Sequence, residues 1–523
     1  MLHTTGAGAA GSSTAYHLAK YVRRLTQEEG SLGSDPERPT FNVSISVFEK
    51  SSYVGGRTQT VNAYRDPSEP VEVGASIFVP ANKILSAAAE EFGFDVGSLT
   101  EGRQKGLRGK GGGETATASA APEFGIWNGQ EFVYIHEGRN QWWDLSKMIW
   151  RYGLLAPMRT DKLVKATVNQ FLRLYEEWQP FQTLTDAAAL LGLTRLTSQT
   201  GRELLESHNI GDKFANEIVQ AATRVNYAQN ISFIHGLETM VSMAGAGAMS
   251  VAGGNWRIFA KMLEIASAEV NLDSDVRKVE RTASKSWELE IHQRGVDGSL
   301  NTRSEAFDTV VIASPFQFTD LKIRPTPLHV PAPVPYVKLY VKLFTSPYEL
   351  SASAFGLPWD ASVPDTILTT LSPPSSSSDD QCPLNGDGSK LSDKVGFFSL
   401  SKLRTIYNPR LHQKEYLYKL FSPTMNGFGY TCHFFGFPIG SDIDSSSCGQ
   451  NHSVVTWSYQ RSWNSYPYEY PRTEFEPHSL DGDLWYTGGM DNFISTMETN
   501  ALMGRKVASD IVDQWTGKHE SDV

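Results

Sequence analysis

The stretch Gly6-Ala7-Gly8-Ala9-Ala10-Gly11 is a GxGxxG motif near the start of the 523-residue chain. Glycines at this spacing typically join a buried parallel strand to a helix, and they let the backbone approach the pyrophosphate of a dinucleotide. Residues 12–26 continue with apolar side chains at i, i+3, i+4 and i+7. That period predicts a helix packed on a sheet. Alone, the motif would also fit a Gly/Ala-rich turn or a helix contact.

Glu49 adds a second signal, because it stands at the end of the next predicted strand, residues 43–48. A carboxylate at that point can accept hydrogen bonds from both ribose hydroxyls of a dinucleotide. Its separation from the glycines exceeds the usual ~20 residues. A surface loop predicted at residues 27–40, which contains two glycines and two prolines, accounts for the excess. A solvated carboxylate at a strand end is the alternative.

The strand before the glycines is unusually short and polar. Only Met1-Leu2-His3-Thr4-Thr5 precedes Gly6, whereas buried parallel strands are normally near-continuous apolar runs. We therefore expect the sequence to be truncated or mis-started, with the rest of the strand and any secretory leader upstream. A genuine short strand is the alternative.

Composition narrows the class of protein. The length predicts roughly two to four structural units. The net charge of −11 is spread without a basic stripe, which argues against a nucleic-acid partner. Cys382, Cys432 and Cys448 lack metal-ligand spacing, so no metal site is expected, and one disulfide remains open. No window approaches the roughly 20 apolar residues of a transmembrane helix.

Dinucleotide-type patterns recur at the start, near residues 250–315 and at the end of the chain. One domain is therefore predicted from residues 1–85, 245–318 and 478–523, and a second from residues 86–244 and 319–477. The period of residues 142–222 is helical, whereas residues 335–344 and 416–421 are predicted strands. Residues 104–122, 373–393 and 440–453 have no hydrophobic period and are predicted to be loops.

Gly55-Gly56-Arg57 resembles the GGR turn of FAD-containing amine-oxidase and prenylcysteine-oxidase families. A second segment that resembles those families begins at Gly253-Gly254-Asn255. The resemblance implies that the backbone of Val276, further along, meets the adenine. Leu484-Trp485-Tyr486-Thr487-Gly488-Gly489 leads into a helix opening at residues 495–498. The resemblance implies that this helix N-terminus points at the flavin, where its partial positive charge stabilises the reduced, anionic form.

The detailed resemblance is to the prenylcysteine oxidase family, and it extends over most of the chain. It implies an α/β fold, with a glutathione-reductase-like FAD-binding Rossmann domain from discontinuous segments and an α+β substrate domain. The segments that carry it are Val73-Gly74-Ala75-Ser76-Ile77, Trp150-Arg151-Tyr152-Gly153, Arg224-Val225-Asn226-Tyr227, Lys419-Leu420-Phe421-Ser422, Tyr466-Pro467-Tyr468 and Ser495-Thr496-Met497-Glu498. The cofactor-binding residues indicated are Gly6, Gly8, Ala9, Ala10, Gly11, Glu49, Lys50, Gly55, Gly56, Arg57, Gly74, Ala75, Ser76, Val276, Gly489, Thr496 and Met497.

The resemblance also implies a reaction. Such enzymes oxidise the carbon next to the thioether sulfur of farnesyl- or geranylgeranyl-cysteine, and give prenyl aldehyde, cysteine and hydrogen peroxide from water and O2. Sulfur assists the loss of hydride, so positioning and electrostatics can supply most of the catalysis. We expect non-covalent FAD and, by resemblance, a lysosomal, vacuolar or secretory location. A flavin oxidase or desaturase of a specialised metabolite and a non-catalytic flavin-containing scaffold are the alternatives.

Candidate catalytic residues are Arg224, Asn226, Tyr227 and Gln229, which could face the flavin or the substrate, or form a buried polar network between the domains. Arg151 and His235 could bind a substrate carboxylate, but an interdomain salt bridge is favoured for both. Lys342 could hold a water near the flavin, as lysines do in related amine oxidases, but a surface strand lysine is favoured.

Trp142, Trp143, Trp150, Leu154 and Leu155 form an apolar group with three interpretations: a prenyl tunnel, a peripheral membrane contact or ordinary helix core. Three N-glycosylation patterns occur, at Asn42, Asn230 and Asn451. The last two are taken as mild support for a glycoprotein of a secretory or vacuolar compartment.

Overall fold

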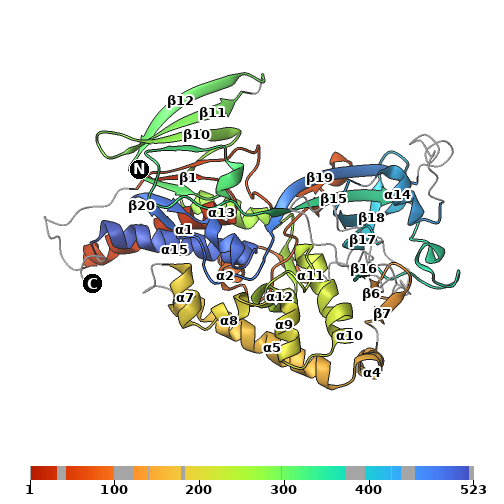
Figure 1. Cartoon of the computed structure of the whole chain (residues 1–523). Coiled ribbons are helices and arrows are strands. Elements are labelled where there is room, and N and C mark those ends of the chain that lie inside the picture. Colours follow the sequence, from red (N-terminus) through yellow and green to blue (C-terminus); the bar gives the residue numbers. More distant parts are fainter. Residues whose placement is uncertain are drawn as a thin grey trace.

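The computed structural model describes residues 2–31, 43–98, 122–138, 140–177, 183–295, 297–371, 395–425, 427–437 and 454–517. In Figure 1, two sheets and the helices α1, α13 and α15 form the part that holds both termini. A larger sheet lies beside them, and a layer of helices runs beneath. The predicted loops at 373–393 and 440–453, and nearly all of 104–122, lie outside the described residues.

The first sheet has the parallel order of a dinucleotide-binding fold. Five of its strands are parallel, and only the edge strand β20 is antiparallel. The α/β, Rossmann-like class is therefore confirmed. In spatial order the strands are β20 (Ser479–Asp481), β21 (Leu484–Tyr486), β13 (Thr309–Ile312), β1 (Leu2–Thr5), β2 (Ile45–Phe48) and β9 (Glu269–Asn271).

The short first strand forms. Leu2–Thr5 lie at the centre of the sheet, paired with β13 on one side and β2 on the other, and all four residues are buried. These residues therefore form a strand in spite of their polar composition, and the expectation of a truncated or mis-started sequence stays a prediction. His3 is tolerated there because its ring packs against Phe48 and Phe307, and burial lowers the pKa of His3 to about 3, which keeps it neutral.

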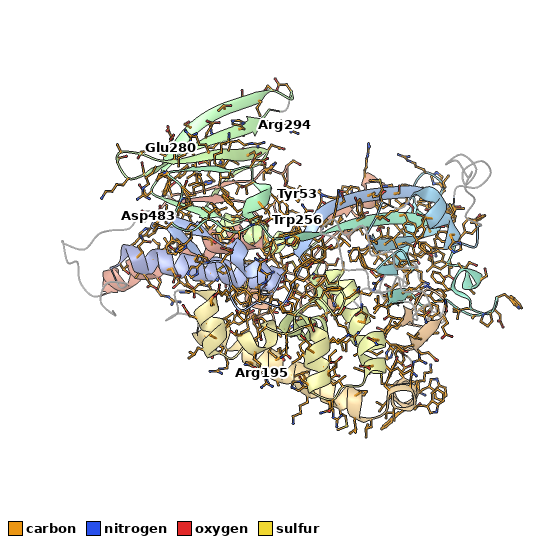
Figure 2. All side chains as sticks on the ribbon, in the orientation of Figure 1. Tyr53, Arg195, Trp256, Glu280, Arg294 and Asp483 are labelled. Atoms are coloured by element: carbon orange, nitrogen blue, oxygen red, sulfur yellow. The ribbon has the colours of Figure 1, made fainter. Side chains whose placement is uncertain are left out.

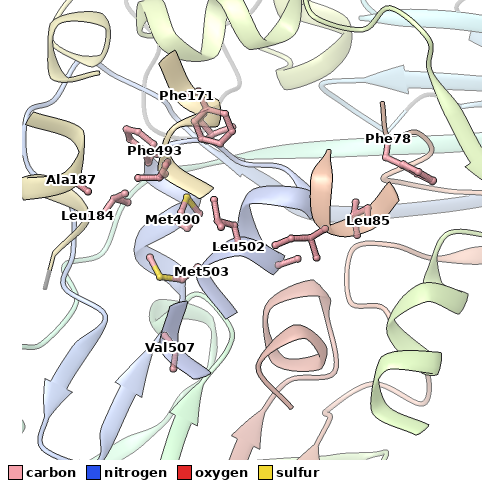
Figure 3. Close-up of a cluster of buried hydrophobic side chains, with 14 of the residues drawn as sticks. Phe78, Leu85, Phe171, Leu184, Ala187, Met490, Phe493, Leu502, Met503 and Val507 are labelled. Carbon is pink, nitrogen blue, oxygen red and sulfur yellow. The ribbon is translucent and has the colours of Figure 1, made fainter. Parts of the chain in front are cut away.

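Three helices pack on one face of this sheet: α1 (Ala9–Ser31), α13 (Trp256–Ile265) and α15 (Met497–Trp515). The predicted loop begins at residue 27, but α1 continues through Ser31. Figure 3 shows Leu502, Met503 and Val507 of α15 in the core with Phe171, Leu184 and Ala187 of the helical layer. This shared core joins the cofactor-type fold to that layer.

A four-stranded sheet covers the opposite face. Its apolar side chains, including Val279, Trp287 and Leu289, pack with Phe48 and Val310 of the first sheet. The order is β12 (Leu300–Phe307), β11 (Trp287–Arg294), β10 (Ser274–Arg281) and β14 (Lys322–Arg324). β14 pairs with β10, although the boundary predicted at residue 318 places the two strands in different domains; the division into domains stays a prediction.

The largest sheet contains both strands predicted at residues 335–344 and 416–421. Its spatial order is β19 (Trp457–Pro467), β15 (Tyr336–Ser346), β18 (Gln413–Ser422), β17 (Ser399–Asn408), β16 (Thr366–Thr369), β6 (Phe124–Trp127) and β7 (Phe132–His136). Its two faces bury separate cores, one against β3 (Thr60–Asn62) and β4 (Pro70–Glu72), the other beneath α14 (Phe428–His433). Cys432 in α14 is disulfide-bonded.

The helical period predicted for residues 142–222 is confirmed. The helices are α4 (Gln141–Tyr152), α5 (Leu155–Leu172), α6 (Leu174–Glu177), α7 (Leu184–Leu190), α8 (Thr194–Thr197), α9 (Gly201–Ser207), α10 (Asp212–Phe214), α11 (Gln220–Tyr227) and α12 (Gly236–Ser242). Further elements include α2 (Lys83–Glu91) and the strand pair β5 (Val96–Ser98) and β8 (Met249–Val251). Among the described helices, none has the length and apolar content needed to cross a bilayer.

Candidate active site

A cavity of about 1100 Å³ runs between the first sheet, the largest sheet and the helical layer. Single small-molecule sites usually measure about 300–1,000 Å³, so this cavity has room for a dinucleotide together with a second molecule. In Figure 2, the labelled Tyr53 lies near the junction of the sheets, and Tyr53 is one of the lining residues.

The two glycine turns build one end of the cavity. The Gly55 amide donates to the Ala7 carbonyl at 2.9 Å, which holds the Gly55-Gly56-Arg57 turn against the first motif. Gly55 has φ +123°, a conformation that other residues rarely adopt. Since α1 begins at Ala9, the unpaired amides of its first turn face this end. The geometry suits a pyrophosphate.

Gly11 has a structural role in packing rather than a role at the cavity. A Cβ at Gly11 would lie 2.0 Å from the Gly6 carbonyl oxygen and 2.9 Å from the Thr4 methyl group. Gly11 therefore allows α1 to pack closely on the strand beneath it, as the third glycine of such a motif is expected to do.

Glu49 lies at the end of β2, as predicted, and lines the cavity. One carboxylate oxygen accepts from the Ala7 amide and the other from the Ser51 amide, each at 2.8 Å. These two bonds fix the orientation of the carboxylate. Each oxygen keeps a further lone pair, so the group fits a ribose diol.

Arg57 is held by Asp491, which sequence reasoning missed. Both Asp491 oxygens accept from the Arg57 guanidinium, at 2.8 and 2.9 Å, and the Ser465 carbonyl accepts at 2.5 Å. Asp491 keeps 2% of its side-chain exposure, whereas Arg57 keeps 35% and lines the cavity. The buried Asp491 therefore fixes the Arg57 guanidinium in an orientation that faces the cavity, where the guanidinium could contact a bound ligand.

The N-terminus of α15 closes the same region. Thr496 caps it through the Thr499 amide, and Thr496 and Met497 line the cavity. Glu498 also lines the cavity, and its carboxylate accepts from the Ile84 and Leu85 amides at the start of α2. The positive end of the α15 dipole therefore faces the cavity, where it would stabilise negative charge on a bound group.

Thirteen of the seventeen indicated cofactor residues line the cavity: Gly6, Gly8, Ala9, Ala10, Glu49, Gly55, Gly56, Arg57, Gly74, Ala75, Ser76, Thr496 and Met497. The lining omits Gly11, Lys50, Val276 and Gly489. Lys50 pairs with Asp275 at 3.3 Å, and Val276 lies within the β10–β11 ladder. Any contact from these two to a bound cofactor remains a prediction.

The four catalytic candidates divide into two pairs. Asn226 and Tyr227 line the cavity. Arg224 is buried outside the lining, where it donates to Thr369 and Asn230. Gln229 donates to the Pro467 carbonyl and accepts from an amide of the same loop. These two lie in a polar network between helix and sheet.

Lys342 is not a surface lysine, and it does not line the cavity. It is 4% exposed, its ammonium donates to the Thr431 hydroxyl at 2.6 Å, and burial lowers the pKa of Lys342 to about 8. The lysine that lines the cavity is Lys419, on the neighbouring strand β18. Alternation along each strand could not have separated them by itself, because the face that meets the cavity depends on how β15 pairs with β18.

Lys419 is fixed by the turn that follows β4. Its ammonium donates to the Glu72 carbonyl at 2.9 Å and to the Ser76 hydroxyl at 2.6 Å. Burial lowers the pKa of Lys419 to about 8, and burial raises the pKa of the Glu72 carboxyl to about 7. Glu72 in turn accepts from the Asn255 amide at 2.5 Å. A cation and a carboxyl that both titrate near neutrality therefore lie at one wall.

The walls of the cavity differ in polarity. The helical wall contributes apolar side chains, among them Val168, Phe171, Leu172, Val225 and Val241. The wall from the largest sheet is mixed and contributes polar ones, among them Ser399, Ser401, Arg404, Lys419, Arg461 and Asn464. Such a cavity suits a molecule with one polar end and one apolar end.

Arg151 forms a salt bridge with Glu217, at 2.7 Å, but within the helical layer rather than between domains. His235 caps α12 by accepting from the Glu238 amide. Burial lowers the pKa of His235 to about 3, so it is neutral beside Glu469 and forms no ion pair at neutral pH.

The support for a glycoprotein weakens at Asn230. Its side chain is buried, and it accepts hydrogen bonds from Gln220 and Arg224. A glycan at Asn230 is incompatible with this packing, so Asn230 gives no support for a glycoprotein, and glycosylation elsewhere stays a prediction. Asn42 and Asn451 lie outside the described residues.

Known proteins share both the fold and the sequence pattern. The cyclohexylamine oxidase of Brevibacterium oxydans superposes with a TM-score of 0.55 over 98% of this chain and 99% of its own, at 14% identity, and a putrescine oxidase variant with 0.54 over 98% of each, at 12%. These show the fold alone. Residues 5–92 match an NAD(P)-binding Rossmann-like domain.

Sequence relatives are more specific. The chain is 25% identical to farnesylcysteine lyase of Arabidopsis thaliana and 23% identical to prenylcysteine oxidase 1 of Bos taurus. Both alignments cover 98% of this chain and 88% of the relative. Residues 135–522 match the prenylcysteine lyase family itself. The chain therefore belongs to the prenylcysteine lyase family and is an FAD-dependent oxidoreductase.

Proposed function

We propose that this protein oxidises the thioether of a prenylcysteine. The observation that supports this most directly is the cavity, which joins the glycine turns and Arg57 to an apolar helical wall and a partly polar sheet wall. A farnesyl or geranylgeranyl chain fits the apolar wall, and the amino-acid end fits the sheet wall. Relatives named farnesylcysteine lyase and prenylcysteine oxidase 1 align with almost the whole chain.

The proposed cofactor is non-covalent FAD. Glu49 would accept the ribose hydroxyls, the amides at the start of α1 would bind the pyrophosphate, and the N-terminus of α15 would face the flavin. When bound, FAD supplies the hydride acceptor and passes the electrons to O2. The balanced reaction consumes prenylcysteine, O2 and water, and yields prenyl aldehyde, cysteine and hydrogen peroxide.

The chain's own residues would bind and orient the substrate, and they would accept the proton that the reaction releases. Two N–H bonds of Lys419 are used by Glu72 and Ser76, and an ammonium has three. In the neutral amine the third position on the nitrogen is a lone pair, and we assign this lone pair to the water that adds to the oxidised carbon. The addition releases a proton, and an amine with a pKa of about 8 can accept it in its neutral form near pH 8.

Anaerobic mixing of the FAD-loaded protein with farnesylcysteine tests the proposal. The oxidised flavin band should disappear, and deuterium at the carbon joined to sulfur should slow its loss. Farnesylcysteine sulfoxide should give little reduction, because its sulfur donates electrons poorly. In a specialised-metabolite oxidase, neither compound would reduce the flavin. In a non-catalytic scaffold, no substrate would reduce it.

A further inference from the structure

Helix α4 has two apolar faces, although only one of them packs on the protein. Met148 and Tyr152 pack beside β6 and β7, and Asp144 anchors the end of β7 by accepting from the Glu137 and Gly138 amides. At 3.6 residues per turn, Trp142, Trp143, Leu145, Ile149 and Trp150 lie along an arc of roughly 160° on the other side.

That arc is exposed. Trp142 keeps 81% of its exposure, Trp143 54% and Trp150 89%. The apolar surface continues past the Gly153 turn into α5, where Leu154, Leu155 and Met158 are each more than half exposed. We call these eight residues the α4–α5 patch; Figure 1 shows α4 at the outer end of the helical layer.

The position and exposure of the patch exclude two of the three interpretations that the sequence left open for these residues. None of its eight residues lines the cavity, so it is not the prenyl tunnel, and its exposure rules out helix core. Soluble proteins rarely expose a contiguous apolar surface of this kind without a partner, and aromatic side chains prefer the interface of a membrane with water.

The charges around the patch favour an anionic surface. Residues 141–173 carry six basic and two acidic side chains. Lys147 pairs with Glu137 and Arg151 with Glu217, which reduces the excess to two positive charges. The whole chain carries −11. Arg159 and Lys162, both exposed, lie within about a turn of Met158.

We propose that the α4–α5 patch docks the protein on a membrane surface that contains anionic lipid. The tryptophans would enter the headgroup region, the helix would lie in the plane of the interface, and Arg159 and Lys162 would face the lipid headgroups. The patch lies outside the cavity, so the docking proposal can be tested independently of the proposed substrate.

Flotation of the full-length protein with vesicles tests the docking. Vesicles of phosphatidylcholine with phosphatidylserine should retain the protein, whereas pure phosphatidylcholine should retain less, and added salt should release it. Loss of one interfacial tryptophan removes enough apolar burial for roughly a tenfold weakening. We therefore expect Trp150→Gln to bind about tenfold more weakly.

Trp359→Gln provides the matched control, because Trp359 is 91% exposed and lies outside the patch. It should bind vesicles like the parent protein. Equal binding by the two variants would overturn the proposal. A parent dimer in sedimentation that Trp150→Gln dissociates, with no vesicle binding by the parent, would assign the patch to a second copy instead. Thermal melting of both variants checks that each remains folded.

Discussion

Lys342 and Lys419 belong to adjacent strands but point to opposite faces of the same sheet. Lys342 pairs with Leu420 and Leu343 pairs with Lys419 across β15 and β18. Directly paired residues share a face of the sheet. Lys342 is next in sequence to Leu343, the partner of Lys419, so the two lysines point to opposite faces: Lys342 lies under α14 and Lys419 lies at the cavity.

Substitution of these two lysines should therefore separate catalysis from packing. Lys419→Met should lower the rate of turnover about a hundredfold, because proton transfer by a positioned side chain contributes roughly 10²–10⁴-fold. Since the neutral amine is the active form, the parent rate should rise through a pH of about 8, and the variant should lack this rise. Steady-state peroxide release with farnesylcysteine across pH 6–9 measures both.

Lys342→Met is the matched control. It should change the thermal midpoint, since it removes the bond to Thr431, but keep the turnover rate of the folded protein and its pH dependence. If both variants lose the same activity, or if Lys419→Met keeps the parent pH profile, the role assigned to Lys419 is wrong.

Glu49→Ala should weaken FAD retention without changing the reaction at saturating FAD. Loss of a charge-assisted hydrogen bond typically costs about 1.5–3 kcal/mol, or roughly a ten- to hundredfold weaker affinity. Titration of the apoprotein with FAD measures it. Glu49→Gln serves as the control for the turn, because it keeps an acceptor for Ala7 or Ser51. Unchanged affinity in both variants would remove Glu49 from the cofactor site.

Gly8 and Gly11 should respond differently to alanine. A Cβ at Gly8 has its nearest neighbour at 3.8 Å, the Gly56 Cα. Gly8→Ala should therefore fold, but lose FAD, because the added methyl group occupies the space of the pyrophosphate. Gly11→Ala should be strongly destabilised, since its Cβ would lie 2.0 Å from the Gly6 carbonyl oxygen. Circular dichroism and flavin absorbance separate the outcomes; a folded Gly11→Ala with normal melting would contradict the packing.

The buried Glu238 should make stability depend on pH. Burial raises the pKa of Glu238 from 4.5 to about 8. Between these values the unfolded chain releases a proton that the folded protein retains, so stability falls as pH rises from about 4.5 to about 8 and then levels. Glu238→Gln mimics the protonated acid.

The thermal midpoint of Glu238→Gln should therefore decline less between pH 5 and pH 8 than that of the parent. Glu90→Gln, at an exposed carboxylate on α2, should decline like the parent. Identical slopes for the two variants would show that Glu238 ionises as readily in the folded protein as in the unfolded chain.

Local signals predicted well which residues meet at one end of the cavity, whereas cofactor binding by them stays a prediction. The glycine turns, Glu49 and the start of α15 depend on short stretches with backbone requirements of their own, and these can be read in sequence. Asp491 was missed because its role depends on Arg57, which is 434 positions away in the chain. β1 was doubted because the packing of His3 between Phe48 and Phe307 is not visible in a polar pentapeptide.

The faces of helices and strands in the second predicted domain were predicted less well, for a different reason. Residues 142–222 were correctly predicted as helical, yet which face of α4 packs depends on β6 and β7, and these strands precede it. Likewise, the register of β15 against β18 decided between the lysines. Of the two, only Lys342 was considered from the sequence as a lysine near the flavin, and residue type could not show that Lys419 is the lysine at the cavity.

The cavity is assembled from parts that a ribosome makes at very different times. β1 lies between β2 and β13, and Leu2 pairs with Thr309. Arg57 meets Asp491 only after most of the chain is complete. At about 5–20 residues per second, the N-terminal glycines would wait of the order of a minute for the helix that closes their site. Flavin capture is therefore expected to follow synthesis, and a flavin-poor cell should accumulate a complete but incompletely closed chain, since binding adds stability only to the closed form.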